Sequence, residues 1–272
     1  MFHFTDVNHL KNYFRARGLK PKDYLGQNFL IDEDVLGEIV KIAELKKDDV
    51  VLEVGPGLGV LTAQLAPNVK TVWAVEKDRN LIPLLKVELK GQKNIEIIND
   101  DILKFHVAEH ISGDYKVVAN IPYYLTSKLI QNFLELTNPP KLMVLMVQKE
   151  VGERVVAGAG ELSLLGISVQ IYSDPEIGLF VSKNSFWPVP EVDSVVLKIM
   201  PSDKYPEITD KKLFFRILKM AFAGKRKQIK NTIKDIDALK KAGIDPMLRP
   251  QDLKIEDWVR LYQVIDKAGL GV

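Results

Sequence analysis

Short apolar runs rich in β-branched residues recur along this chain, and stretches with helical spacing of their apolar side chains separate them. Five runs have the length and composition of buried strands: 50–54, 71–75, 95–98, 116–119 and 142–147. Helical stretches between them include 61–65, 80–89 and 127–136. Strands that alternate with helices pair in parallel and bury both faces of the sheet. The pattern therefore predicts an α/β fold with a mostly parallel sheet that binds ligands at the carboxyl ends of its strands.

The pattern changes toward the C-terminus. A run at 194–200 follows the proline-rich segment 187–190, which predicts a final edge strand. Beyond Pro201 and Pro206 the pattern is helical, at 213–222, 227–233, 236–242 and 255–268. We therefore expect two domains: an α/β domain over 1–204, which starts with a basic segment at 1–24, and a small all-helical domain over 205–272.

The charges are unevenly distributed, although 38 basic and 36 acidic residues give a net charge of only +2. Residues 211–234 contain nine Lys or Arg and no acid, and residues 7–22 contain five and no acid. Residues 48–101 contain nine acids and six bases. Two basic segments around an acidic middle are typical of a protein that binds a polyanion. Solvated helix faces give the same composition, so neither segment alone decides between the two interpretations.

Composition excludes several kinds of chemistry. Without cysteine the chain can form neither disulfides nor thiolate metal sites, and its four histidines are scattered without metal-ligand spacing, so we expect no metal. The sequence has no run of 18 apolar residues, and its start lacks the apolar stretch of a signal peptide. We therefore expect a cytoplasmic protein that does not bind membranes.

A glycine-rich loop, 53–59, follows the first strand, and its glycines fall at alternate positions. Val60 stands where the dinucleotide fingerprint requires a third glycine, so phosphate binding is the weaker interpretation. Glu76 closes the second strand 21 residues after Gly55, about the offset of a carboxylate that binds ribose hydroxyls. Asp101 follows the third strand, where it can accept a hydrogen bond from an exocyclic amine. Each feature alone can be structural, but together they favour an adenosine ligand without a pyrophosphate, such as S-adenosylmethionine.

The fourth strand continues into Asn120-Ile121-Pro122-Tyr123. An adenine amino group is a poor nucleophile because its lone pair is delocalised into the ring, so a methyltransferase must hold that nitrogen. Asn120 can accept one N–H bond through its side chain, a backbone carbonyl of Ile121 or Pro122 can accept the other, and Tyr123 offers a face for stacking. The segment predicts catalysis by positioning rather than by a strong base, although Asn-x-Pro turns also occur for structural reasons alone.

An ordered set of motifs over residues 15–265 resembles the ribosomal RNA adenine N6-dimethyltransferases. The motifs are Leu25-Gly26-Gln27-Asn28-Phe29-Leu30, the loop 53–59, Asn120-Ile121-Pro122-Tyr123, Gln148-Lys149-Glu150-Val151 with Arg154, Phe186-x-Pro188-x-Pro190-x-Val192-Asp193-Ser194, and Phe222-x-x-x-Arg226-Lys227 with Asn231. The resemblance implies a Rossmann-like class I methyltransferase domain with a seven-stranded mostly parallel sheet, followed by a helical rRNA-binding domain. The match is loosest near Arg154, where Gly152 and Gly166 replace an expected Ala and Ser.

The sequence most resembles the branch that dimethylates two adjacent adenosines near the 3′ end of small-subunit (16S) rRNA during ribosome biogenesis. The resemblance implies S-adenosyl-L-methionine as the cofactor, with contacts from Asn28, Leu30, Gly55, Glu76, Asp101 and Asn120. Asn120 would also hold the target N6, and Tyr123 and Phe186 would stack on the two faces of the flipped adenine. Phosphates of the rRNA would bind Lys225, Arg226, Lys227 and Lys230. We expect a monomer that binds an assembly intermediate of the small subunit.

Two alternatives share these features. The sister enzymes that dimethylate large-subunit rRNA and confer macrolide resistance have the same cofactor and catalytic motifs, but 192–194 and Arg226-Lys227 with Asn231 favour the small-subunit branch. The protein could also be mainly an assembly factor with secondary catalysis, although the intact Asn120 and Tyr123 argue that catalysis is retained. A nicotinamide dehydrogenase is opposed by Val60.

Overall fold

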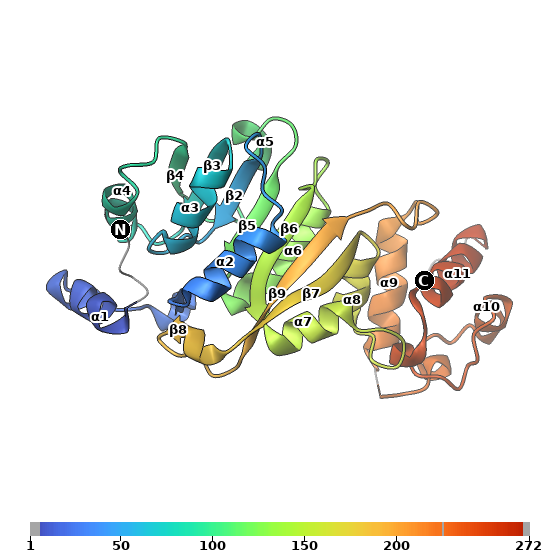
Figure 1. Ribbon diagram of the computed structural model, residues 1–272. Helices are drawn as coiled ribbons and strands as arrows, with labels where there is room; N and C mark the ends of the chain where they lie inside the picture. Colours follow the sequence, from blue (N-terminus) through green and yellow to red (C-terminus); the bar gives the residue numbers. More distant parts are fainter. Residues whose placement is uncertain (1–5, 225, 269–272) are drawn as a thin grey trace. The chain divides into compact units, whose positions relative to one another are not determined.

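The computed structural model describes residues 6–224 and 226–268, which form two compact units (Figure 1). The first comprises the described residues of Met1–Gly152 with Glu176–Pro201, and the second those of Glu153–Pro175 with Ser202–Val272. The sequence predicts one boundary at 204/205, whereas the structure also assigns residues 153–175 to the C-terminal unit. The reason is packing: Leu162 and Ile167 are buried in the same apolar cluster as Phe214 and Trp258.

A seven-stranded sheet forms the centre of the first unit, with the strand order β4-β3-β2-β5-β6-β9-β7 (Figure 1). Its strands are β2 (Val50–Val54), β3 (Thr71–Glu76), β4 (Ile95–Asn99), β5 (Lys116–Asn120), β6 (Leu142–Gln148), β7 (Ser173–Val181) and β9 (Ser194–Pro201). The strands from β2 to β6 pair in parallel, and β9 runs antiparallel to β6. The predicted mostly parallel sheet of seven strands is thus confirmed.

The position of the last predicted strand is wrong. β9 lies between β6 and β7, and β7 is the edge strand. The proline-rich segment suggested an edge, but Val195, Val196 and Leu197 are fully buried. β7 itself is not predicted from the sequence because Pro175 and Gly178 interrupt its pattern.

The first unit also contains several helices. They are α1 (Val7–Ala16), α2 (Glu33–Ile42), α3 (Val60–Leu65), α4 (Ile82–Glu88), α5 (Val107–His110), α6 (Thr126–Leu134) and the start of α7 (Lys149–Val156). Apolar side chains of α2 and α3, among them Ile39 and Leu65, share one core cluster with Val51 and Val72 of the sheet. The helix predictions at 61–65, 80–89 and 127–136 therefore match α3, α4 and α6 to within two residues at each end.

Residues 19–31, which we call the N-terminal strap, connect α1 to α2. Within the strap, β1 (Phe29–Leu30) pairs antiparallel with β8 (Phe186–Trp187). The Phe14 ring of α1 lies 5.3 Å from the rings of both Phe29 and Trp187. These contacts fix the C-terminal end of the strap, around Phe29.

The second unit contains α8 (Leu164–Gln170), α9 (Lys211–Phe222), α10 (Ile236–Lys241) and α11 (Ile255–Lys267) around its own apolar core. The helix expected at 227–233 is only a single 3-10 turn, η5 (Ile229–Asn231). Tertiary bonds replace helical ones there, since the Ile229 N–H donates to the Leu248 carbonyl and the Lys230 N–H to that of Pro246. No helix in the described part of the chain is both long and apolar enough to cross a membrane.

The two glycines that depart from the family pattern have a steric explanation. A β-carbon on Gly152 would lie 2.2 Å from Cγ2 of Val195, and one on Gly166 would lie 2.5 Å from the carbonyl oxygen of Arg154. Neither distance is tolerated without rearrangement, so the packing of this chain requires glycine at both positions.

Candidate cofactor and substrate site

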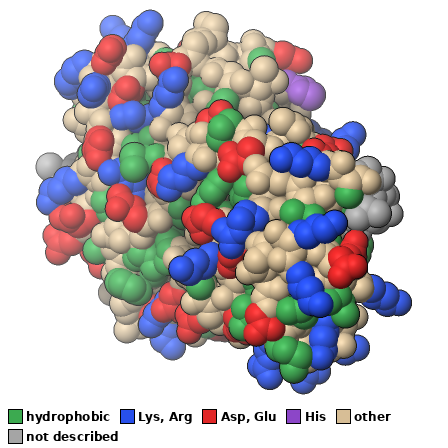
Figure 2. All heavy atoms as spheres, turned by 90° about the vertical axis from the view of Figure 1, so that its right-hand side faces the viewer, with side chains coloured by type: hydrophobic (Ala, Val, Ile, Leu, Met, Phe, Trp, Pro, Cys, Tyr) green, Lys and Arg blue, Asp and Glu red, His purple; other side chains and the backbone are tan. Residues whose placement is uncertain are grey.

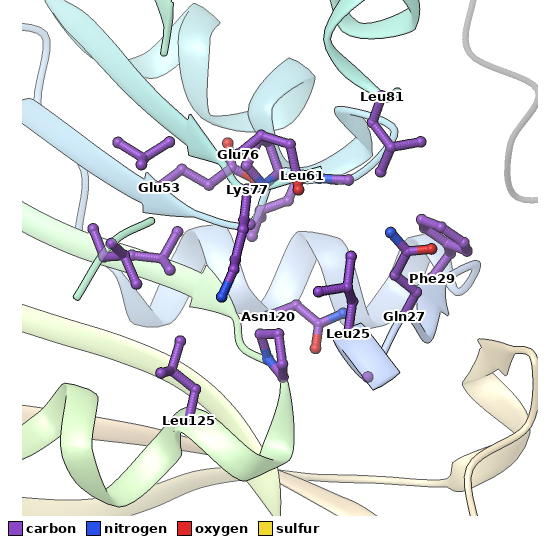
Figure 3. Close-up of a pocket in the computed structure, with 18 of the residues that line it drawn as sticks. Leu25, Gln27, Phe29, Glu53, Leu61, Glu76, Lys77, Leu81, Asn120 and Leu125 are labelled. Atoms are coloured by element: carbon purple, nitrogen blue, oxygen red, sulfur yellow. Dashed lines mark hydrogen bonds between the residues drawn. The ribbon is translucent and has the colours of Figure 1, made fainter. Parts of the chain in front are cut away.

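A pocket opens at the carboxyl ends of β2, β3, β4 and β5, where the sequence predicts a ligand (Figure 3). Figure 3 shows Glu53, Glu76 and Lys77 on one side of it and Asn120 and Leu125 on the other. The strap supplies a further wall through residues 25–30. Of the predicted cofactor-binding residues, the pocket brings together Asn28, Leu30, Gly55, Glu76, Asp101 and Asn120.

The glycine loop adopts a conformation that other residues rarely take. Gly55, Gly57 and Gly59 have φ values of 67°, 60° and 82°. A β-carbon on Gly57 would also lie 3.3 Å from the Phe29 ring. The loop can therefore lie close against the strap and leave its backbone facing the pocket.

Glu76 is bonded to the loop and to its own turn. Its Oε2 accepts from the Gly57 N–H at 3.0 Å and its Oε1 from the Asp78 N–H at 2.7 Å. The side chain is 6% exposed, and burial raises its pKa. Because each carboxylate oxygen has two lone pairs, both can still accept from a ligand hydroxyl.

Replacing Glu76 with alanine should weaken S-adenosylmethionine binding by about 1.5 to 3 kcal/mol, or roughly 10- to 150-fold, since a charge-assisted acceptor for two hydroxyls is lost. Calorimetric titration measures the affinity. Glu96→Ala, an exposed residue on the adjacent strand β4, is the matched control. Unchanged affinity in Glu76→Ala would remove this carboxylate from the site.

Glu53 is a buried carboxyl in the pocket wall, with 1% exposure, and its Oε2 has no hydrogen-bond partner within the described structure. Burial, with a smaller contribution from the Glu76 charge, raises the pKa of Glu53 from 4.5 to about 8. The Glu53 carboxyl is therefore largely protonated at neutral pH.

This pKa shift predicts a pH dependence of stability. Between pH 4.5 and 8 the unfolded chain has lost the Glu53 proton whereas the folded chain keeps it, so the free energy of unfolding falls as pH rises through this range. Glu53→Gln removes the titration, and its stability relative to wild type should increase from pH 5 to pH 8. Urea titrations at both pH values measure this, with exposed Glu96→Gln as control. The same pH dependence in Glu53→Gln and wild type would contradict the assignment.

Asp101 follows β4 and lines the same pocket. Its Oδ2 pairs with Nζ of Lys77 at 2.9 Å, and its Oδ1 accepts from the Leu103 N–H at 3.1 Å. Burial opposes ionisation, but the Lys77 ammonium and the Leu103 N–H outweigh it and lower the pKa of Asp101. The group is thus an ionised acceptor, as recognition of an amine requires.

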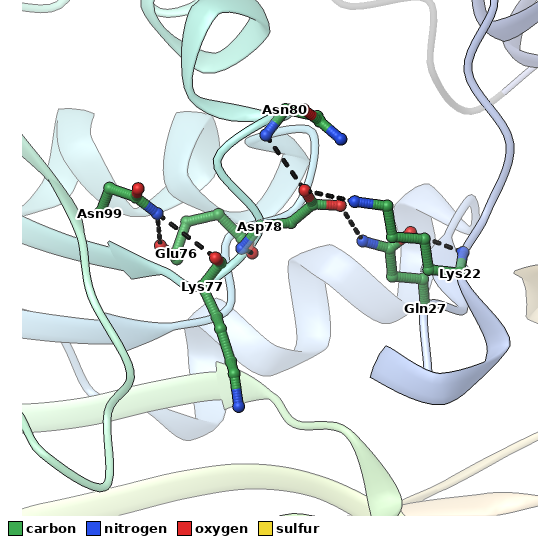
Figure 4. A network of polar contacts seen from close by, with 7 residues as sticks. All are labelled: Lys22, Gln27, Glu76, Lys77, Asp78, Asn80 and Asn99. Atoms are coloured by element: carbon green, nitrogen blue, oxygen red, sulfur yellow. Dashed lines mark hydrogen bonds and ion pairs between the residues drawn. The ribbon is translucent and has the colours of Figure 1, made fainter.

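Asp78 connects the strap to the end of β3, a contact that no pattern in the sequence predicts (Figure 4). Its carboxylate, 4% exposed, accepts from Nζ of Lys22 at 2.7 Å, from Nε2 of Gln27 at 2.9 Å and from the Asn80 N–H at 3.0 Å. Gln27 Oε1 in turn accepts from the Lys22 N–H at 2.8 Å. Since the Asp78 N–H donates to Glu76, one hydrogen-bond network joins the strap to the proposed ribose-binding acid.

The side-chain amide of Asn120 is oriented by the strap. Its Nδ2 donates to the backbone carbonyl of Asn28 at 3.1 Å. The carbonyl of Asn28 can only accept, so this bond fixes which end of the amide faces the strap. Oδ1 is left as an acceptor in the wall of the pocket.

The two rings expected to stack on a target base, Phe186 and Tyr123, pack against other parts of the first unit. Phe186 is only 1% exposed, because β8 pairs with β1 and the ring packs into the core cluster that contains Leu30. Tyr123 is half-buried, and its hydroxyl lies 2.9 Å from Oγ of the buried Ser194. Neither ring lines the pocket in this conformation, whereas the neighbouring Tyr124, which is 60% exposed, does.

The predicted RNA-binding residues belong to the second unit. Arg226 and Lys227 are exposed, and Lys230 is half-buried with Nζ 2.9 Å from Sδ of Met247. Lys225 lies outside the described residues. Figure 2, which faces the side of the C-terminal helices, shows many Lys and Arg side chains interspersed with Asp and Glu. Within the described residues, no group of three or more His, Asp or Glu could hold a metal ion.

Comparison with known proteins shows relatives along nearly the whole chain. Residues 18–267 match the family model described as ribosomal RNA adenine dimethylase. The ribosomal RNA small subunit methyltransferase A of Dehalococcoides mccartyi (strain CBDB1) is 41% identical over 263 residues, which cover 92% of this chain and 90% of the relative. The protein of the same name from Clostridium botulinum (strain Okra / Type B1) is 40% identical, with 89% and 92% covered.

Two solved structures are similar as well. A dimethyladenosine transferase from Plasmodium falciparum has a TM-score of 0.79 at 27% identity, and the match covers 88% of this chain and 97% of that one. The 23S rRNA methyltransferase ErmE has a TM-score of 0.72 at 26% identity, with 88% and 100% covered. By the match of its sequence over residues 18–267 and its similarity to these relatives, the chain belongs to the ribosomal RNA adenine dimethylase family.

Proposed function

We propose that this protein uses S-adenosylmethionine to dimethylate the N6 amino groups of two adjacent adenosines near the 3′ end of small-subunit (16S) rRNA during ribosome biogenesis. Its family and the names of its 40–41% identical relatives support this function. The structural observation that carries the proposal is the Asn120 amide, which is oriented by the Asn28 carbonyl in a pocket that also holds Glu76 and Asp101.

The pocket fits the proposed cofactor. When bound, S-adenosylmethionine supplies an electrophilic methyl group on its sulfonium. Glu76 would accept from the ribose hydroxyls and Asp101 from the adenine amine, and both carboxylates keep free lone pairs. Glu53, whose Oε2 has no hydrogen-bond partner within the described structure, lines the same pocket as Gly55 and would accept a hydrogen bond from the methionine part. Asn28 and Leu30 would close the strap side of the pocket.

Asn120 would make the target nitrogen reactive. Its Oδ1 accepts one N6–H bond, and a backbone carbonyl of Ile121 or Pro122 accepts the other. Two acceptors at tetrahedral positions favour the pyramidal amine, whose lone pair is no longer delocalised into the ring. Since methylation acidifies the nitrogen, its proton leaves readily and the site needs no strong base.

We further propose that the substrate is an assembly intermediate of the small subunit and that the enzyme acts in the cytoplasm as a monomer. The exposed Arg226 and Lys227, with Lys230, would bind rRNA phosphates. Light scattering of the purified protein tests the monomer, since a particle of twice the 30.7 kDa chain mass would contradict it.

Transfer of tritiated methyl groups tests the activity. The protein is incubated with labelled S-adenosylmethionine and either immature small subunits or large subunits, with Asn120→Ala as the inactive control. We expect label in small-subunit rRNA alone. Label in large-subunit rRNA would instead support the macrolide-resistance type of activity, and the absence of transfer to either subunit would refute the proposed function.

A further inference from the structure

Tyr124 presents an aromatic ring to solvent at the edge of the pocket. It belongs to the 3-10 turn η3 (Tyr123–Leu125), which follows Pro122, and it is 60% exposed. The turn is closed by the Leu125 N–H, which donates to the Pro122 carbonyl at 2.9 Å. The ring is therefore carried by a fixed backbone four residues after Asn120.

One edge of the Tyr124 ring faces the strap at close range. A β-carbon added to Gly26 would lie 3.8 Å from Cδ1 of Tyr124 and 3.2 Å from Cβ of Pro122. Gly26 has a φ of 62° and ends the turn η1 (Asp23–Leu25). The strap thus lies beside this ring at Gly26, while Tyr124 as a whole stays more than half exposed.

A second exposed tyrosine lies on the strap itself. Tyr24 is 74% exposed, and it precedes Leu25 and Gly26, which both line the pocket. Lysines occur on the strap, at Lys20 and Lys22, and on α6, at Lys128, while Lys77 after β3 lines the pocket. Lys22 and Lys77 are paired with Asp78 and Asp101, respectively. The Asp101 hydrogen bond raises the pKa of Lys77, and the nearby Tyr124 phenol contributes to the increase.

Exposed aromatic rings among cations are the features by which proteins bind unpaired nucleotides, because every base can stack on a ring and the cations attract the phosphates. Phe186 and Tyr123, the rings expected to stack on the target adenine itself, are buried and half-buried, respectively, so neither offers a face to a neighbouring nucleotide. Tyr124 and Tyr24 are the exposed tyrosines on the two segments that border the pocket.

We infer that Tyr124, assisted by Tyr24, binds the unpaired nucleotide next to the target adenosine by stacking on its base. This inference rests on the proposed function. The target N6 must reach Oδ1 of Asn120 in the wall of the pocket, so a base stacked on the solvent-exposed ring of Tyr124 is a neighbour of the target rather than the target itself.

Tyr124→Leu and Tyr124→Phe test the inference, because leucine keeps the apolar bulk without the aromatic face and phenylalanine keeps the face. Loss of one base stack should raise the KM for immature small subunits about 5- to 100-fold in Tyr124→Leu, with kcat within about threefold of wild type. Tyr124→Phe should stay within about twofold. Tyr24→Leu should give a smaller increase in KM. Phe180→Leu is the matched control, since Phe180 is 63% exposed on β7 and does not line the pocket.

Calorimetry with S-adenosylmethionine separates the remaining outcomes. Unchanged cofactor affinity in Tyr124→Leu, together with the raised KM, supports the inference. A parallel loss of cofactor affinity would overturn it and assign the ring to the cofactor pocket. A KM equal to that of wild type would also overturn it while leaving the proposed function intact. If wild-type protein transfers no methyl group to small subunits, the proposed function fails and this inference fails with it.

Discussion

Asn120→Ala is expected to lower the single-turnover rate of methyl transfer by about 100-fold or more, while S-adenosylmethionine affinity stays close to that of wild type. The reason is that Oδ1 of Asn120 stabilises the pyramidal amine, which exists only as the methyl group arrives. Rapid-quench measurements with saturating labelled cofactor and immature small subunits give the rate. Asn132→Ala, which replaces an asparagine on α6 away from the proposed cofactor pocket, is the matched control.

A conservative variant tests whether the orientation of the Asn120 amide matters. Asn120→Asp keeps an acceptor oxygen but loses the Nδ2 bond to the Asn28 carbonyl. It also places a carboxylate oxygen of the new side chain against the Asn28 carbonyl oxygen, and both of these atoms are acceptors. We expect it to be nearly as slow as Asn120→Ala. If Asn120→Ala retains a rate within a few-fold of wild type, the residue is only part of the turn.

The second large effect is expected on rRNA binding. Changing Arg226, Lys227 and Lys230 to Gln removes three proposed phosphate contacts from the second unit. Each contact releases condensed counterions, so the slope of log K against log salt concentration should become shallower by about 2 to 3. Binding of small subunits should therefore weaken strongly at low salt, while S-adenosylmethionine affinity is unchanged. Filter binding over a range of salt concentrations measures the slope.

A second triple variant controls for net charge. Lys240, Lys241 and Lys254 are exposed in the same unit, and their replacement by Gln changes the charge equally. Its slope should stay close to that of wild type. If both triple variants keep the wild-type slope, the segment 226–230 is an ordinary solvated surface, and the basic segment between Lys11 and Lys22 becomes the candidate RNA surface.

The sheet and the polar wall of the pocket could be predicted from the sequence because both follow from local patterns. Each parallel strand is a short apolar run, and the residue at its carboxyl end must lie at the same edge of the sheet as the others. Glu76, Asp101 and Asn120 therefore converge in the pocket although 44 residues separate the first from the last.

Contacts between segments distant in sequence could not be predicted in the same way. The hydrogen bonds from Lys22 and Gln27 to Asp78 depend on how the strap folds back toward the end of β3. This path of the chain produces no periodic pattern in the sequence. Phe186 is buried because β8 pairs with β1. These strands have only two residues each, which is too short for the alternation of apolar and polar residues that predicts a strand. The packing of residues 153–175 with the C-terminal helices likewise depends on an apolar cluster whose members extend from Leu162 to Ile265 in the sequence.

Identification of the modified nucleosides tests the central claim most directly. Immature small subunits are methylated to completion by the wild-type protein, and the rRNA is digested and analysed by mass spectrometry after mapping of the modified fragment. We expect two adjacent N6,N6-dimethyladenosines near the 3′ end of 16S rRNA and none in the same RNA treated with Asn120→Ala. Methyl groups on another atom, on another nucleotide or only on large-subunit rRNA would contradict it.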